Sequence, residues 1–174
     1  MGVTLLFCLS LLSGCAPSSP GPSKAGEAFK KEVLAARDSL APALMDAVAK
    51  REPRSTKKIL EQRCALAMEG GSPFACGITV LDNHGITLAS ASPGEPIKRI
   101  DYSRYEVVMK ALKERKVVKA RLFLQDGTKL YVVAIPLVRN GESIGLLGLA
   151  FDSADLRNRF GLTEDDFMMV DLNG

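Results

Sequence analysis

Three apolar segments in the second half of the chain are joined by two short turns, and this pattern constrains the fold more than any other feature. The segments cover residues 117–125, 129–138 and 143–152, with Asp126-Gly127 and Asn140-Gly141 between them. Asx-Gly pairs accept the positive φ angles that tight hairpins need. The sequence therefore predicts an antiparallel three-stranded meander.

The residues before and after this meander predict further helices and strands. Residues 24–50 place apolar side chains three or four positions apart, which predicts one long amphipathic helix with a kink or a new turn at Pro42. A second helix is expected from Ser55, acting as its cap, to about Met68. The other expected elements are strands at 78–81 and 86–90, helices at 105–112 and 154–159, and a last short strand at 167–172.

The opening residues differ in composition from the rest of the chain. Residues 3–12 form an uncharged apolar run that is typical of a signal peptide and too short to span a bilayer. Leu12-Ser13-Gly14-Cys15 follows, and it resembles the lipobox of bacterial lipoproteins. That resemblance implies cleavage before Cys15, acylation of its sulfur, and attachment to the outer or inner membrane on the periplasmic side. A plain signal peptide cut elsewhere is the alternative.

A Pro- and Gly-rich stretch after Cys15 indicates an extended tether. We therefore expect four parts: a signal peptide at 1–14, the acylated cysteine and tether at 15–23, a helical stalk at 24–71, and the folded sensor region at 72–174.

Cys64 and Cys76 are the cysteines that remain once Cys8 leaves with the leader and Cys15 carries lipid. The periplasm favours disulfides, so we expect these two to form one. Two buried free thiols are the alternative, and no metal site is expected because partner ligands are missing nearby.

Composition argues against two functional classes. The net charge is +3 with both signs interspersed, and no basic stripe with interleaved aromatics suggests nucleic-acid binding. The single histidine, His84, lies in an expected turn, and the sequence has no nucleophile elbow, glycine-rich phosphate loop or CxxCH motif. We expect neither an enzyme nor a cofactor; a haem held by His84 and Cys64 or Cys76 is the remaining alternative.

The order of these elements resembles that of a known family. The stretches VLDNHGITLAS, DYSRYEVVMKAL and LFLQDGTKLYVVAIPLVRNGESIGLLGLAFD, with the long helix before them, resemble a single Cache domain, which is an extracytoplasmic PAS-like module. The resemblance implies an α+β fold: a long N-terminal helix, then a five-stranded antiparallel sheet with flanking helices that binds a small molecule on one face. With a lipid anchor in place of a transmembrane helix, any signal would pass to a separate signalling or envelope protein.

Hairpin geometry suggests part of a binding face. A two-residue turn at Asn140-Gly141 would pair Tyr131 with Ala150 and Val133 with Gly148, so the small residues would leave space beside the tyrosine. Arg121 joins that face if residues 126–128 form a three-residue loop, and points away if the turn has two residues.

The segment 101–105 lies where Cache domains usually supply ligand contacts. There Arg104 could bind a carboxylate and Tyr102 could close over it. The alternatives are that Gly148 and Ala150 only accommodate a packed helix, that Arg104 is a solvated charge, and that Tyr131 belongs to the core.

These features predict a membrane-anchored periplasmic domain that senses a small organic molecule, with a carboxylate as the expected class. The alternative is a ligand-free interaction or dimerisation module, with a homodimer formed through the N-terminal helix. A filled sheet face would favour that module, whereas an open pocket would favour the sensor.

Overall fold

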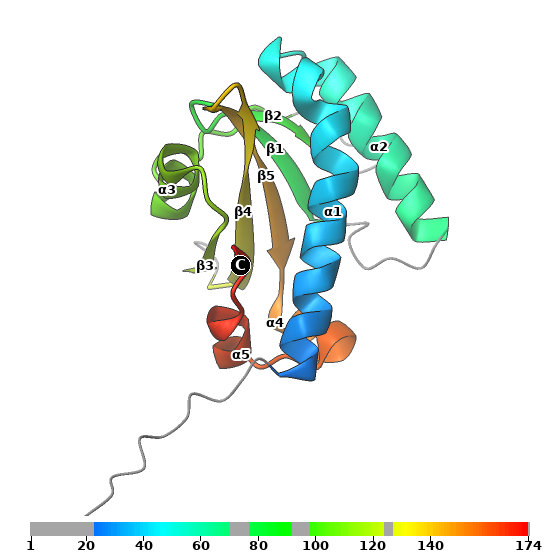
Figure 1. Ribbon diagram of the computed structural model, residues 1–174, viewed down its shortest axis with the longest axis vertical. Helices are drawn as coiled ribbons and strands as arrows, with labels where there is room; N and C mark the ends of the chain where they lie inside the picture. The colour runs from blue at the N-terminus through cyan, green and yellow to red at the C-terminus, as the bar shows by residue number, and fades with distance from the viewer. Residues whose placement is uncertain (1–22, 70–76, 92–97, 124–126, 174) are drawn as a thin grey trace, which may run out of the picture.

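The computed structural model describes residues 23–69, 77–91, 98–123 and 127–173 and shows helices on both faces of one sheet (Figure 1). The sheet is antiparallel, with five strands in the order β2-β1-β5-β4-β3. The strands are β1 (Ile78–Asp82), β2 (Thr87–Ser90), β3 (Val118–Phe123), β4 (Lys129–Arg139) and β5 (Glu142–Phe151). The predicted α+β fold is confirmed.

Two long helices and the C-terminal helical segment pack on one face of the sheet, and one helix covers the other (Figure 1). On the first face lie α1 (Lys24–Ala49) and α2 (Pro53–Glu69), and on the second lies α3 (Glu106–Glu114). The chain ends in α4 (Ser153–Asp155), the π-helix η2 (Leu156–Phe160) and α5 (Glu164–Met169).

The main core lies between α1 and the sheet. The apolar stripe of α1 is buried, as its spacing predicts, and the helix continues through Pro42. Phe29 contributes the centre of an aromatic cluster, with ring centroids 5.4 Å from Phe151, 5.1 Å from Phe160 and 5.6 Å from Phe167. The segment expected to be a stalk therefore packs into the domain's own core. Among the described residues, α1 has no exposed large apolar side chain to support the expected homodimer contact.

A smaller cluster lies between α3 and the opposite face of the sheet. Its buried members are Leu81, Val107, Val108, Ala111, Leu112, Ala134 and Leu146. The left-handed conformation of Arg115 ends α3 one residue after Glu114. This thinner layer of side chains borders the candidate site.

Two local predictions are wrong. The expected strand at 167–172 is instead helix α5 followed by an irregular tail, because Thr163 and Asp166 form a capping box that starts a helix. Lys119 then donates to the carbonyl oxygens of Phe167, Met168 and Val170 at the end of that helix. Ser55 is not a helix cap either, since α2 already begins at Pro53, a residue well suited to a first helical position.

The predicted lipobox at Cys15 lies outside the described residues. Cys76 lies outside them too, so the expected disulfide between Cys64 and Cys76 stays a prediction. Within the part of the chain that is described, no helix is long and apolar enough to cross a membrane.

Candidate functional site

A cavity of about 210 Å³ lies between α3 and the sheet. Small residues create this space, because four positions of its wall carry glycine or alanine. Its lining residues are Gly77, Thr79, Leu81, Tyr102, Tyr105, Val107, Val108, Leu122, Leu130, Val132, Ala134, Leu146, Gly148 and Ala150. A Cβ added at Gly148 would meet only the Thr79 oxygen at 3.5 Å and a Leu146 methyl at 3.8 Å. Gly148 therefore opens a volume and does not seat α3 directly.

The β1–β2 turn positions the tyrosines at the cavity. The backbone N–H of Tyr102 donates to the Gly85 carbonyl at 2.9 Å, and Gly85 has φ +80°. A Cβ at Gly85 would lie 3.1 Å from the Ser103 nitrogen, so a larger residue would push the tyrosine segment away. The Asp101 carboxylate accepts from the Ser103 N–H at 2.8 Å and fixes the next bend.

Polar groups in the cavity wall are few. The Tyr102 and Tyr105 rings lie 5.8 Å apart, and both are half-buried. Burial, followed by the neighbouring Tyr105, raises the pKa of Tyr102, so its hydroxyl stays protonated and can donate. Thr79 adds a further hydroxyl near that of Ser90. Among the described residues that form the lining, none is charged.

The structure brings together three of the six predicted ligand-binding residues: Tyr102, Gly148 and Ala150 line the cavity. Arg104 is exposed and does not line it. The predicted grouping of Tyr131 with Gly148 and Ala150 is wrong, because Tyr131 lies on the opposite face of the sheet.

The cause of that error is a bulge in the β4–β5 ladder. Val138 pairs with Ser143 as the two-residue turn requires, but Leu137 pairs with Gly145, which leaves Ile144 without a partner. Beyond the bulge Tyr131 pairs with Phe151 instead of Ala150. A slip of one residue exchanges the two faces of a strand, so Tyr131 turns into the main core.

Arg121 shares the Tyr131 face, since the two residues pair directly across β3 and β4. It therefore also points away from the cavity. Its guanidinium lies 3.6 Å from the Glu164 carboxylate of α5. Arg121 thus pairs with a carboxylate of the protein and not with a carboxylate of a ligand in the cavity.

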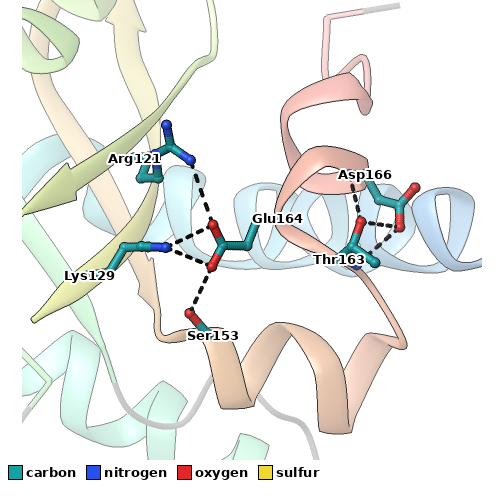
Figure 2. Close-up of polar contacts among 6 residues, drawn as sticks. All are labelled: Arg121, Lys129, Ser153, Thr163, Glu164 and Asp166. Atoms are coloured by element: carbon teal, nitrogen blue, oxygen red, sulfur yellow. Dashed lines mark hydrogen bonds and ion pairs between the residues drawn. The ribbon is translucent and has the colours of Figure 1, made fainter.

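Glu164 is the centre of a polar cluster on this second face (Figure 2). Its two carboxylate oxygens each accept from the Lys129 ammonium at 2.9 Å, and the Ser153 hydroxyl lies 3.5 Å from one of them. The buried Tyr131 hydroxyl has no partner in hydrogen-bond geometry among the described residues. It is close enough to the Glu164 carboxylate to favour its charged form, and together with Lys129 it lowers the pKa of Glu164 to about 2. This cluster ties α5 to β3 and β4.

Comparison with known proteins supports the fold. No family model matches the sequence, and no curated protein matches it. Among solved structures, a domain of a sensory box/GGDEF family protein from Vibrio parahaemolyticus is 17% identical with a TM-score of 0.55, and the match covers 81% of this chain and 60% of that one. The extracellular domain of the histidine kinase vpHK1S-Z8 is 18% identical with a TM-score of 0.57, covering 81% and 57%.

A third structure is the ligand-binding domain of the Pseudomonas fluorescens chemoreceptor CtaA in complex with L-isoleucine. It is 17% identical with a TM-score of 0.52, and the match covers 77% of this chain and 54% of that one. The match therefore spans between half and two thirds of each of these three solved chains. The likeness shows a PAS-like, Cache-type fold.

Sequence reasoning missed most of the apolar wall of the cavity in this Cache-type fold. Leu122, Leu130 and Val132 line it from β3 and β4, and they alternate with residues that point to α5. The alternation along β3 and β4 predicts that these three residues share a face. An unbulged β4–β5 hairpin, however, predicts that Gly148 and Ala150 lie on the opposite face, beside Tyr131.

His84 is exposed and lies 2.9 Å from an Arg51 nitrogen, and Asn83 also accepts from Arg51.

Proposed function

We propose that this chain is a membrane-tethered extracytoplasmic sensing domain that binds a small organic molecule between α3 and the sheet. The observation that carries the proposal is the cavity lined by Gly148, Ala150 and the two tyrosines. An open volume on the sheet face supports the sensor over a ligand-free interaction module, which would be expected to fill that face.

The size and lining of the cavity suggest the chemistry of the ligand. Its volume of about 210 Å³ is below the roughly 300–1,000 Å³ of pockets for drug-sized molecules, so the ligand has few heavy atoms. Aliphatic walls favour an apolar body, and the Tyr102, Tyr105 and Thr79 hydroxyls can hydrogen-bond a polar end. A short branched aliphatic molecule fits this description.

We assign a carboxylate to the polar end of the ligand, with Arg104 as its cation. Arg104 is exposed and lies between the two cavity tyrosines in the chain. L-Isoleucine, which occupies the CtaA domain of the same fold, combines such an aliphatic body with a carboxylate. Arg121 has no part in this site because its guanidinium lies beside Glu164 on the other face.

Tethering and output form the second part of the proposal. The lipobox resemblance at Cys15 supports a lipid anchor in the periplasm, and more than one acyl chain gives a stable attachment. A domain held in this way would pass its ligand state to a separate signalling or envelope protein. Mass spectrometry of the mature chain would test the anchor directly, since acylation adds a defined mass to Cys15.

A thermal-shift screen tests the ligand. The full chain is heated with aliphatic amino acids, short branched carboxylates and small amines, one at a time. A ligand present at a hundred times its dissociation constant adds about 2.7 kcal/mol to the free energy of unfolding and raises the melting temperature. A flat screen across all three classes would contradict the sensor and favour the interaction module.

Matched variants then locate the site. Gly148→Val should fold but lose the ligand-induced shift, because its methyl groups enter the cavity, whereas Gly148→Ala should keep most of it. Arg104→Ala should weaken binding of carboxylates, and Arg121→Ala should leave it unchanged. Equal binding by Gly148→Val and the parent chain would show that the ligand sits elsewhere.

A further inference from the structure

One end of the molecule gathers exposed apolar side chains. Five large hydrophobic residues of the described chain are well exposed: Ile100, Met109, Phe123, Met168 and Met169. Single exposed apolar residues are ordinary on protein surfaces, so their distribution is what matters. Three of the five lie around α5, and they include the two most exposed, Met169 at 77% and Phe123 at 63%.

The Glu164 cluster connects these three residues. Met168 and Met169 are the last residues of α5, and Met168 lies one helical turn beyond Glu164. Glu164 pairs with Arg121, whose guanidinium lies 5.8 Å from the centre of the Phe123 ring. Phe123 and the α5 methionines therefore belong to the same part of the surface.

This part of the surface adjoins the beginning of α1. A Cβ added at Gly26, in the first turn of α1, would lie 3.2 Å from a methyl of Val170, the residue after Met169. One turn further on, the Phe29 ring packs on Phe167. Figure 1 shows the start of α1 together with α4 and α5 at one end of the molecule. The exposed methionines thus lie next to the point where the chain enters the fold.

The short chain between Cys15 and Lys24 limits how far this end can lie from a membrane. Eight residues separate the two positions. Even when fully extended at about 3.4 Å per residue, this length spans only about 30 Å. An anchor at Cys15 would therefore keep the α5 end close to the bilayer.

We infer that the α5 end docks on the bilayer surface, with Met168, Met169 and Phe123 entering the boundary between headgroups and acyl chains. The inference rests on the proposed anchor at Cys15. Methionine suits this role because its flexible thioether adapts to irregular apolar surroundings. Charges at this end have both signs, since Arg157 and Asp165 border the same surface pocket, so apolar contact and not lipid charge is the attraction. Zwitterionic lipid is sufficient for docking.

The absence of tryptophan from the sequence provides a clean test. Met169→Trp places the only indole of the protein at the docking end, and Met109→Trp places it on α3 at a residue that is 43% exposed. Each acylated full-length variant is reconstituted on phosphatidylcholine vesicles with and without brominated acyl chains. We expect loss of fluorescence and a shift to shorter wavelength at position 169, and neither change at position 109.

Flotation of the same samples separates the two ways of failing. Protein that does not float with the vesicles lacks the proposed anchor. Protein that floats while the indole at position 169 is not quenched keeps the anchor and overturns the docking. A blue shift at position 169 that needs no vesicles and grows with protein concentration also overturns it, because a second copy would then cover this end.

Discussion

The face of the sheet toward α1 is filled by large side chains, whereas the face toward α3 carries many small ones. On the first face, Tyr131 and Phe151 pack against Phe29 and its aromatic neighbours, together with Leu147 and Leu149 of β5. On the second, Ala134, Gly148 and Ala150 border an open cavity. The same strands supply both faces, because successive side chains of a strand point to opposite sides. The difference therefore lies in the size of the residues at alternate positions.

This difference separates stability from binding within one sheet. Packing of large aromatic and aliphatic side chains on the α1 face stabilises the fold. Incomplete packing on the α3 face leaves room for another molecule. The following changes should break or sharpen that contrast.

Phe29→Ala should have the largest effect. The side chain is fully buried and contacts three other aromatic rings, so its removal should lower the free energy of unfolding by about 3–5 kcal/mol. Val132→Ala, on the cavity side, should cost only about 1 kcal/mol because Val132 already borders open space. Urea denaturation of both variants checks the contrast, and equal losses would show that the two faces are equally packed.

Two glycines of β5 offer a finer test. A Cβ at Gly145 would lie 2.4 Å from the Leu81 carbonyl oxygen and 2.6 Å from a Val48 methyl, whereas at Gly148 the nearest atom is 3.5 Å away. Gly145→Ala should therefore cost about 1–3 kcal/mol through overpacking. Gly148→Ala should be neutral or stabilise by up to about 1 kcal/mol, because alanine reduces the freedom of the unfolded chain. Melting temperatures that fall equally for both would contradict the assigned faces.

The smallest effect concerns Glu164, at the polar border of the filled face. Its pKa is lowered from 4.5 to about 2 by the Tyr131 hydroxyl and by Lys129, so its stabilising contribution is complete above pH 4.5 and is lost as the pH falls through 2. The Glu164→Gln variant lacks this contribution at every pH, because glutamine carries no carboxylate. The difference in melting temperature between the parent and the variant should therefore be constant near neutral pH and shrink between pH 4.5 and 2.

Asp165→Asn is the matched control for this titration. Asp165 is the exposed neighbour of Glu164, so its variant removes one carboxylate from the same helix and leaves the Glu164 contacts in place. A difference for Glu164→Gln that stays constant down to pH 2 would mean that the carboxylate gains nothing from Tyr131 and Lys129.

The elements with local signals could be predicted from the sequence. Helical spacing in α1, the Asn140-Gly141 turn and the patterns of the five sheet strands all depend on residues close in the chain, and these predictions were confirmed. The capping box of Thr163 and Asp166 was also a local signal for α5, although the apolar residues after it suggested a strand.

The faces of the strands depended on non-local information. No glycine, proline or other turn residue at Ile144 indicates the bulge in the sequence. The bulge shifts the β4–β5 register by one residue, and Tyr131 therefore lies on the face opposite to Gly148 and Ala150. The partner of Glu164 could not be predicted either, because β3 and α5 are brought together only by the folded chain. Tyr102, Gly148 and Ala150 do line the cavity, although the pairing with Tyr131 and Val133 from which the two small residues were predicted is wrong.

The alternation along β3 and β4 has a consequence for how this protein can change. Leu122, Leu130 and Val132 line the cavity, while their immediate neighbours Arg121, Lys129 and Tyr131 face the C-terminal helix. The residues that would set ligand preference can thus be exchanged without altering those that hold the helix. Libraries confined to these three cavity positions should yield altered preferences at little loss of folded protein, and natural divergence could follow the same route.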